Sequence, residues 1–178
     1  MRFETERLIL RPWDAGDAES CYEYARDPRI GPDAGWPVHR SVENSREIIE
    51  NVLAVPENYA VCLKEDNRAI GAVGIKIGIL SDLLLPGDEG ELGCWLGAPF
   101  WGRGLIPEAL GRLMEHAFCD LELKKLWYVY FDGNAKSKRV QEKLGFQYQY
   151  TVKDKECPLI QAVMTEHVNS ITKEQAGY

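Results

Sequence analysis

The chain lacks the cysteine and histidine patterns that mark a disulfide framework or a metal site. Its five cysteines are odd in number, scattered and without any Cys-x-x-Cys pair, as expected of a protein from a reducing compartment. The three histidines, His39, His116 and His167, are too far apart in the sequence to suggest a metal cluster. We therefore expect free thiols, no metal ion and a cytoplasmic location.

Long apolar runs and an excess of basic residues are also missing. No segment approaches the ~20 apolar residues that a transmembrane helix requires, and the opening MRFETERLILRPW is charged from residue 2, unlike a signal peptide. Lys and Arg number 21 against 28 Asp and Glu, a formal charge of −7, which argues against broad binding to a nucleic-acid backbone. We expect neither a membrane nor a nucleic acid as partner, although a local site can still bind one anion.

What the chain does have is enough apolar material for a core. With 45% hydrophobic and 28% charged residues over 178 positions, the composition fits one compact domain, 1–178, and not a disordered chain.

The apolar periodicity predicts a mixed α/β sheet flanked by helices. Strands are expected at 5–13, 59–63, 70–77, 91–96, 126–131, 146–152 and 160–165, and helices after Asp14, after Ser41, at 105–119 and at 134–144. In the irregular segment between Leu80 and Gly90, three consecutive leucines are expected to form a buried plug or, alternatively, a surface for a partner or substrate.

The segment from Trp95 to Ala109 has the form of an anion-binding turn. A strand ends, Gly102 and Gly104 follow, and an amphipathic helix begins at once, with Pro107 in its first turn. Glycines let backbone N–H groups approach an anion, and a helix start adds free donors. Each hydrogen bond to a charged acceptor contributes about 1.5–3 kcal/mol, more than the roughly 0.3–1 kcal/mol of the helix dipole. An ordinary strand–helix connection is the alternative, and neither a P-loop nor a dinucleotide fingerprint is present.

Three segments, in the right order, resemble the GNAT superfamily of acyl-CoA N-acyltransferases. The turn at 101–106 resembles that family's pyrophosphate-binding motif, Gln/Arg-x-x-Gly-x-Gly/Ala. The opening segment 5–13 (TERLILRPW) and the segment 134–146 (NAKSKRVQEKLGF) are similar to the RimJ/RimL branch, the ribosomal-protein N-terminal acetyltransferases and their relatives. Two departures stand out. Ile106 is bulky where the family has Ala or Gly, which would tighten the cradle around the phosphates, and the segment 157–165 matches the branch poorly.

The resemblance implies the GNAT fold, a mixed and mostly antiparallel sheet flanked by helices, and transfer of an acetyl group from acetyl-CoA to a primary amine. Because the family reacts by direct attack, no cysteine nucleophile is required, and Cys94 is interpreted as a core residue. The acetyl-CoA site implied by the resemblance comprises Trp95, Leu96, Gly97, Trp101, Gly102, Arg103, Gly104, Leu105, Ile106, Asn134, Lys136, Ser137 and Arg139.

Three residues receive catalytic roles from the resemblance. Glu91 is placed as a base that acts through water, with a solvated strand-end carboxylate as the alternative. Asn134 is placed near the pantetheine arm, with a simple helix N-cap as the alternative, and the two roles are compatible. Ser137, one turn along the helix and on a face turned towards the sheet, is placed to stabilise or protonate the departing sulfur. Many relatives carry a tyrosine acid where this chain has Gln141, so that acid is missing.

The acceptor amine is left open by the sequence. A protein N-terminal α-amine is favoured by the resemblance, and small amines such as polyamines or aminoglycosides are the alternative. A CoA-binding module that has lost catalysis is a third reading, and the chain is expected to be a monomer or a homodimer.

Overall fold

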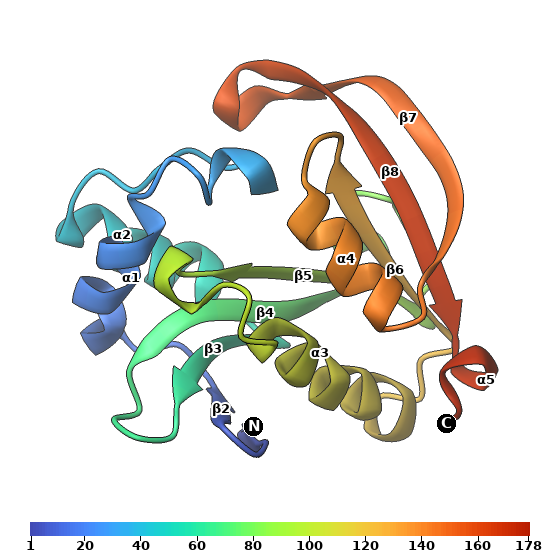
Figure 1. Cartoon of the computed structure of the whole chain (residues 1–178), viewed down its shortest axis with the longest axis horizontal. Coiled ribbons are helices and arrows are strands. Elements are labelled where there is room, and N and C mark those ends of the chain that lie inside the picture. The colour runs from blue at the N-terminus through green and yellow to red at the C-terminus, as the bar shows by residue number, and fades with distance from the viewer. The chain divides into compact units, whose positions relative to one another are not determined.

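The computed structural model describes all residues, 1–178, and confirms the predicted mixed α/β architecture, with an eight-stranded and mostly antiparallel sheet flanked by helices (Figure 1). The strand order is β1-β2-β3-β4-β5-β6-β8-β7. The strands are β1 (Phe3–Glu4), β2 (Leu8–Arg11), β3 (Asn58–Leu63), β4 (Ala69–Ile77), β5 (Glu89–Leu96), β6 (Lys125–Phe131), β7 (Gln147–Cys157) and β8 (Ala162–Thr172). The helices are α1 (Ala18–Ala25), α2 (Val42–Ile48), α3 (Leu105–Glu115), α4 (Ala135–Lys143) and α5 (Lys173–Ala176).

The contacts within the chain divide it into two compact units. Unit 1 comprises 1–74 and 94–109, and unit 2 comprises 75–93 and 110–178. That residues 1–178 act as one domain stays a prediction. No helix is both long enough and apolar enough to cross a membrane.

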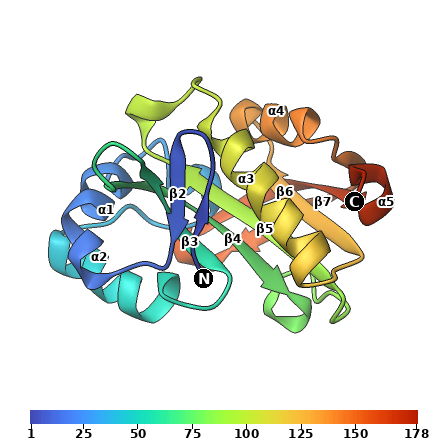
Figure 2. The same cartoon turned by 90° about the horizontal axis from the view of Figure 1, so that it is seen from below.

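Unit 1 is built on antiparallel pairing of β1, β2, β3 and β4. The helices α1 and α2 lie beside these strands (Figure 2). Asp14 caps a 3-10 turn that leads into α1, and Ser41 caps α2 by accepting a hydrogen bond from the Asn44 amide at 3.1 Å. Cys21 and Ala25 on α1 are fully buried, in a core cluster that also contains residues of the sheet.

Unit 2 contains a parallel pair of strands. β5 and β6 pair from Glu89 opposite Lys125 to Leu92 opposite Tyr128. β6 pairs along its length with β8 on its other side, and β8 pairs with β7. The helix α4 lies over β6 (Figure 1), and its fully buried Gln141 donates a hydrogen bond to the Val129 carbonyl on that strand.

Three predicted strands differ from the structure. The strand expected at 5–13 is the four-residue β2, with β1 lying before the predicted range, because a turn at Thr5, whose amide bonds the Leu8 carbonyl at 3.0 Å, folds the chain back on itself. The strand expected at 146–152 continues to Cys157 as β7. The strand expected at 160–165 begins at Ala162 and continues to Thr172 as β8. Pairing with β6 and β7 on both sides holds this more polar stretch in the sheet.

The leucine plug is only partly confirmed. Leu85 is buried and Leu83 is half-buried, but Leu84 is 77% exposed. Left-handed backbone at Leu84, with φ of 51°, accompanies a turn in which adjacent side chains lie in different surroundings.

All five cysteines are free thiols, as expected. Cys21 and Cys62 are fully buried, and burial raises the pKa of each thiol to about 12. Cys94 is half-buried, whereas Cys119 is exposed.

Candidate active site

The predicted anion-binding turn at 101–106, called the phosphate turn from here on, lies in unit 1 and has left-handed backbone at its two glycines. After β5 the chain makes a short 3-10 turn at Ala98–Phe100 and enters α3 at Leu105. Gly102 and Gly104 have φ of 76° and 77°, in the left-handed region that favours glycine. Nothing lies within 4 Å of a Cβ built on Gly102. The demand for glycine there is therefore conformational, and the space beside it is open to a ligand.

Two residues outside the turn hold it in place. Arg7 donates from its main-chain N and from Nε to the Glu108 carboxylate, at 2.9 and 2.7 Å, and from Nη1 to the Arg103 carbonyl at 2.9 Å. Thr5 donates to the same carboxylate. Burial acts to raise the pKa of Glu108, but the hydrogen bonds from Thr5 and Arg7 outweigh it and lower that pKa. Glu108 is thereby an ionised anchor on the first turn of α3.

Sequence reasoning missed the roles of Arg7 and Glu108. Both lie in or beside quoted motifs, but they are 101 positions apart in the chain, and no local pattern pairs them. Only the fold brings the opening segment to the start of α3.

The large side chains of the turn contact other parts of unit 1. Trp101 donates from Nε1 to the Leu96 carbonyl at 2.7 Å, and the Arg29 guanidinium lies 5.4 Å from its ring centroid. Arg103 is exposed and lies over Phe100. Ile106 is 8% exposed, so most of its side chain is packed within the protein. That its bulk tightens the cradle around the phosphates stays a prediction.

The residues at the end of β5 are mostly committed to the fold. Leu96 is buried, and the Gly97 amide donates to the Ile70 carbonyl at 2.8 Å. A Cβ on Gly97 would lie 2.8 Å from the Tyr24 ring, so glycine is needed there for close packing. Trp95 is half-buried and stacks on Trp13, with ring centroids 6.2 Å apart.

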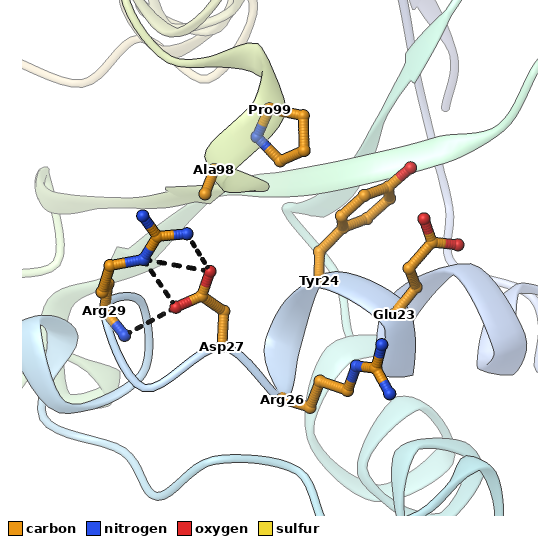
Figure 3. Close-up of a pocket in the computed structure, with 7 residues that line it drawn as sticks. All are labelled: Glu23, Tyr24, Arg26, Asp27, Arg29, Ala98 and Pro99. Carbon is orange, nitrogen blue, oxygen red and sulfur yellow. Dashed lines mark hydrogen bonds and ion pairs between the residues drawn. The ribbon is translucent and has the colours of Figure 1, made fainter.

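A cavity of about 420 Å³ in unit 1 lies beside the 3-10 turn at Ala98–Phe100 (Figure 3). Figure 3 shows Arg29 and Asp27 pointing at each other, and their closest contact is 2.6 Å. Glu23 on α1 is paired with Arg68. Two of the charged residues that line this cavity therefore pair with each other, and none of its lining residues belongs to the acetyl-CoA site expected from the sequence.

Glu91 in unit 2 is a buried carboxyl, 8% exposed. The Ser81 hydroxyl donates a hydrogen bond to its Oε2 at 2.6 Å. Burial raises the pKa of Glu91, and the Ser81 hydrogen bond opposes that rise. The alternative of a solvated strand-end carboxylate is therefore wrong. Gly93, two residues along the same face of β5, is exposed with nothing within 4 Å of a built Cβ, so there is open space on this face.

The start of α4 combines a cap with a polar network. Asn134 caps the helix by accepting a hydrogen bond from the Ser137 amide at 3.0 Å. The Ser137 hydroxyl accepts one from Gln141 at 3.2 Å, and Gln141 in turn accepts one from Asn169 at 2.6 Å. Ser137 therefore lies on the face of α4 that is turned towards β6. Lys136 and Arg139, which the resemblance assigned to acetyl-CoA, are exposed.

A second cavity, of about 290 Å³, lies at the start of α4. Asn134 lines it together with Tyr130, Asp132, Gly133, Ala135, Lys138 and His167. His167 contacts the Asp132 carboxylate at 3.2 Å through Nε2 and the Thr151 hydroxyl at 2.9 Å through Nδ1. Sequence reasoning missed His167 and Asp132, because neither belongs to a motif.

Each unit, taken by itself, contains groups that suit one part of acetyl-CoA or of its reaction. Left-handed glycines at a helix start suit an anionic pyrophosphate. Polar side chains around the cavity at Asn134 suit an amide-containing arm, and a buried carboxyl with a raised pKa suits proton acceptance.

Comparisons with known proteins agree with this chemistry. Residues 7–147 match the family model described as an acetyltransferase (GNAT) domain. The uncharacterised N-acetyltransferase p20 of Bacillus licheniformis is 25% identical over 178 residues, which cover 97% of each chain. A GNAT-family acetyltransferase structure from Bacillus anthracis superposes with a TM-score of 0.84 at 22% identity, over 98% of this chain and 99% of that one. YdaF of Bacillus subtilis strain 168, provisionally named a ribosomal N-acetyltransferase, is 33% identical over 92 residues, 46% of this chain and 50% of YdaF. With most of its length matched by the family model, the chain belongs to the GNAT acetyltransferases and is an acyltransferase.

Proposed function

We propose that the chain transfers the acetyl group of acetyl-CoA to a protein N-terminal α-amine. The observation that carries this proposal is the pair of left-handed glycines, Gly102 and Gly104, at the start of α3 within the segment that matches the family. Amides at 102–106 bind the pyrophosphate, because the first turn of a helix has N–H groups without intrahelical partners.

The reaction forms a C–N bond and breaks the C–S bond of the thioester. A neutral amine attacks the thioester carbonyl, its proton passes through a water molecule to Glu91, and CoA leaves as a thiolate that takes up a proton. A pKa raised by burial suits Glu91 to this task, since a stronger base accepts a proton more readily near neutral pH.

Asn134 and Ser137 act on the thioester side in this proposal. Asn134 keeps its capping bond while its side chain lines the cavity at the start of α4, where it contacts the pantetheine arm. The Ser137 hydroxyl accepts from Gln141 and has its own proton to donate to the departing sulfur. Since a thiol has a pKa of about 8.5, imperfect proton donation is tolerated.

An α-amine is the acceptor that this machinery suits best. Its pKa of about 7.7–8 leaves roughly a tenth of it neutral near pH 7, whereas a lysine at about 10.4 is less than a thousandth neutral. A single buried carboxylate is therefore better matched to an α-amine, because a larger fraction of that amine is already neutral and needs no deprotonation before it attacks. The provisional name of YdaF, a ribosomal N-acetyltransferase, supports the same choice.

A thiol-release assay with a panel of amines tests the proposal. Peptides with free N-termini, the same peptides with blocked N-termini and an internal lysine, polyamines and aminoglycosides are compared at equal concentration. Release of CoA is expected with free N-termini and not with blocked ones. Turnover of polyamines or aminoglycosides alone would replace the proposed acceptor, and CoA binding without any turnover would leave a binding module.

A further inference from the structure

The segment 78–88, which precedes β5 in unit 2, is a folded loop to which no role has been given. The Gly78 carbonyl accepts hydrogen bonds from the amides of Ser81 and Leu85, at 3.1 and 3.2 Å. At the other end of the segment, the Asp88 carbonyl accepts one from the Lys124 amide at 2.8 Å. The segment is therefore fixed at both ends.

Ser81 is the inward-facing polar residue of this segment. It is 2% exposed, and its hydroxyl oxygen accepts a hydrogen bond from the Leu83 amide at 3.0 Å while its proton is donated to Glu91 at 2.6 Å. A hydroxyl has one proton and two lone pairs. With a backbone donor on its oxygen, Ser81 has its proton directed at the carboxylate.

We propose that Ser81 is a positioning residue for Glu91, and that the segment 78–88 serves to hold this hydroxyl against the carboxylate. Ser81 fixes the rotamer of Glu91 and favours its ionised form, because a hydroxyl donates a stronger hydrogen bond to a carboxylate than to a neutral carboxyl group. This inference rests on the proposed function, in which Glu91 accepts the proton of the amine.

Other charged groups near Glu91 come as pairs. Lys76 on β4 pairs with Asp82 at 2.9 Å, and Lys155 on β7 pairs with Glu166 on β8 at 2.8 Å. β6 places the uncharged Trp127 opposite Glu91, and the indole of Trp127 bonds Glu89.

Burial and the Ser81 hydrogen bond are the two main influences on the pKa of Glu91. Burial raises the pKa of Glu91 most, the Ser81 hydrogen bond lowers it next, Lys76 lowers it, and Asp82 and Glu166 raise it. Because the paired charges offset one another, removing the Ser81 hydroxyl leaves burial largely unopposed. The pKa of Glu91 then rises further.

The alternative is that Ser81 merely satisfies a buried carboxyl and supports the fold. A structural role lowers activity equally at every pH, because it reduces the fraction of folded enzyme or distorts the whole site. A positioning role acts through the ionisation of Glu91 and changes the shape of the pH profile.

The test compares kcat/KM against pH, with saturating acetyl-CoA and an N-terminal peptide, for matched variants. Ser81→Ala removes the hydroxyl, Ser81→Thr keeps it, and Ile79→Ala changes an 84% exposed side chain of the same segment. Glu91→Gln and the double variant Ser81→Ala/Glu91→Gln complete a double-mutant cycle. Ser81→Cys, which keeps the volume but donates weakly, replaces Ser81→Ala if that variant does not fold.

The acidic limb of the profile is expected to move to higher pH in Ser81→Ala, with the loss largest at the acid end and small at the alkaline end. Ser81→Thr and Ile79→Ala should follow the wild type, and Ser81→Ala should add nothing in the Glu91→Gln background. A Ser81→Ala profile that superimposes on the wild type, or a loss that persists with Glu91→Gln, overturns the inference. If Glu91→Gln keeps the acidic limb of the wild-type profile, Glu91 is not the base. That result overturns the proposed function and is distinguishable from a failure of the inference about Ser81 alone.

Discussion

The phosphate turn of unit 1 and the Glu91 strand of unit 2 have opposite surroundings, and the proposed function gives them different tasks. The turn has open space beside Gly102, and Arg7 bonds its Arg103 carbonyl and Glu108 on the first turn of α3. Glu91 is buried and accepts a hydrogen bond from one hydroxyl. Anion binding depends on conformation and therefore on glycine, whereas proton acceptance depends on surroundings that set a pKa. Substitutions in the first region should alter binding, and those in the second should alter chemistry.

The largest effect is expected from Gly104→Val. Gly104 has φ of 77°, which a β-branched residue does not adopt, so the turn must rearrange and lose its converging amides. Each lost bond to a charged acceptor contributes about 1.5–3 kcal/mol, so the Kd for CoA should rise by about 10²-fold or more. Isothermal titration calorimetry measures this, with thermal unfolding to show that the fold survives. Gly111→Ala, at a helical glycine without positive φ, is the matched control, and unchanged affinity in Gly104→Val would refute the placement.

Glu91→Gln should slow chemistry and spare binding. Loss of a general base lowers kcat by roughly 10²- to 10⁴-fold, while the Kd for CoA stays at the wild-type value because Glu91 contributes no phosphate contact. The loss should be greatest at pH values above the acidic limb of the wild-type profile, where Glu91 is ionised, and smallest at low pH, where the wild-type carboxyl is itself protonated. Steady-state kinetics across pH give the answer, with Glu89→Gln on the same strand as control. A parallel rise in the Kd for CoA would show that the two regions do not divide the work as described.

Ser137→Ala should have a partial effect, at the lower end of general-acid losses. Since thiolate is a tolerable leaving group, kcat should fall by about 10²-fold with little change in the acceptor KM. Rates with acetyl thioesters of lower thiol pKa sharpen the test, because a better leaving group should reduce the deficit. Lys143→Ala, on the same helix, serves as the control. An equal deficit with every thioester would remove Ser137 from the leaving-group side.

Arg7→Met should weaken CoA binding moderately. The guanidinium bonds Glu108 and the Arg103 carbonyl, and its side chain is 43% exposed, so solvent reduces its contribution. We expect about a tenfold rise in Kd, corresponding to ~1.4 kcal/mol, with kcat unchanged. Titration calorimetry at two salt concentrations measures it, and Arg2→Met, in an exposed pair with Glu4, is the control. A fall in kcat with unchanged Kd would contradict a role in holding the turn.

The smallest effect concerns His39, which touches neither region but sits in unit 1. Burial lowers its pKa to about 4, from 6.5 in the unfolded chain. Between these two pKa values His39 binds a proton in the unfolded chain but not in the folded chain. The contribution of neutral His39 to the free energy of unfolding is therefore fully present above pH 6.5 and is lost as the pH falls towards 4. His39→Gln should flatten the dependence of the free energy of unfolding on pH in this window, as measured by urea denaturation. An equally steep dependence in the variant would assign it to other groups. The comparison also separates unfolding in acid from the ionisation of Glu91.

The sequence predicted the elements with strong apolar periodicity and the places where motifs begin. The long helix from Leu105 agrees with the structure, because burial of one helix face is a local pattern. The cap at Asn134 was foreseen as well, because asparagine at the start of a helix is a local N-cap signal. The extension of β8 to Thr172 was not, since its polar residues are held by neighbours on both sides.

The motifs of the candidate site could be predicted from the sequence, whereas the contacts that hold these motifs in place could not. The glycine turn is written in consecutive residues, but the contact of Arg7 with Glu108 joins positions far apart in the chain. The burial of Glu91 could not be read from its acidic neighbours, Asp88 and Glu89, which suggested a solvated strand end. It depends on the segment 78–88, whose irregular sequence gives no periodic signal.

The uneven burial of the cysteines decides how the proposed activity can be followed. Reagents that detect released CoA react with any accessible thiolate. Cys21 and Cys62 are buried and have a raised pKa, so these two thiols do not react with such reagents at neutral pH. The exposed Cys119, just beyond α3, contributes a background of its own in every colorimetric trace. Cys119→Ser removes that background, and the unsubstituted thiol offers a position for a fluorescent label that reports binding without touching the turn or Glu91.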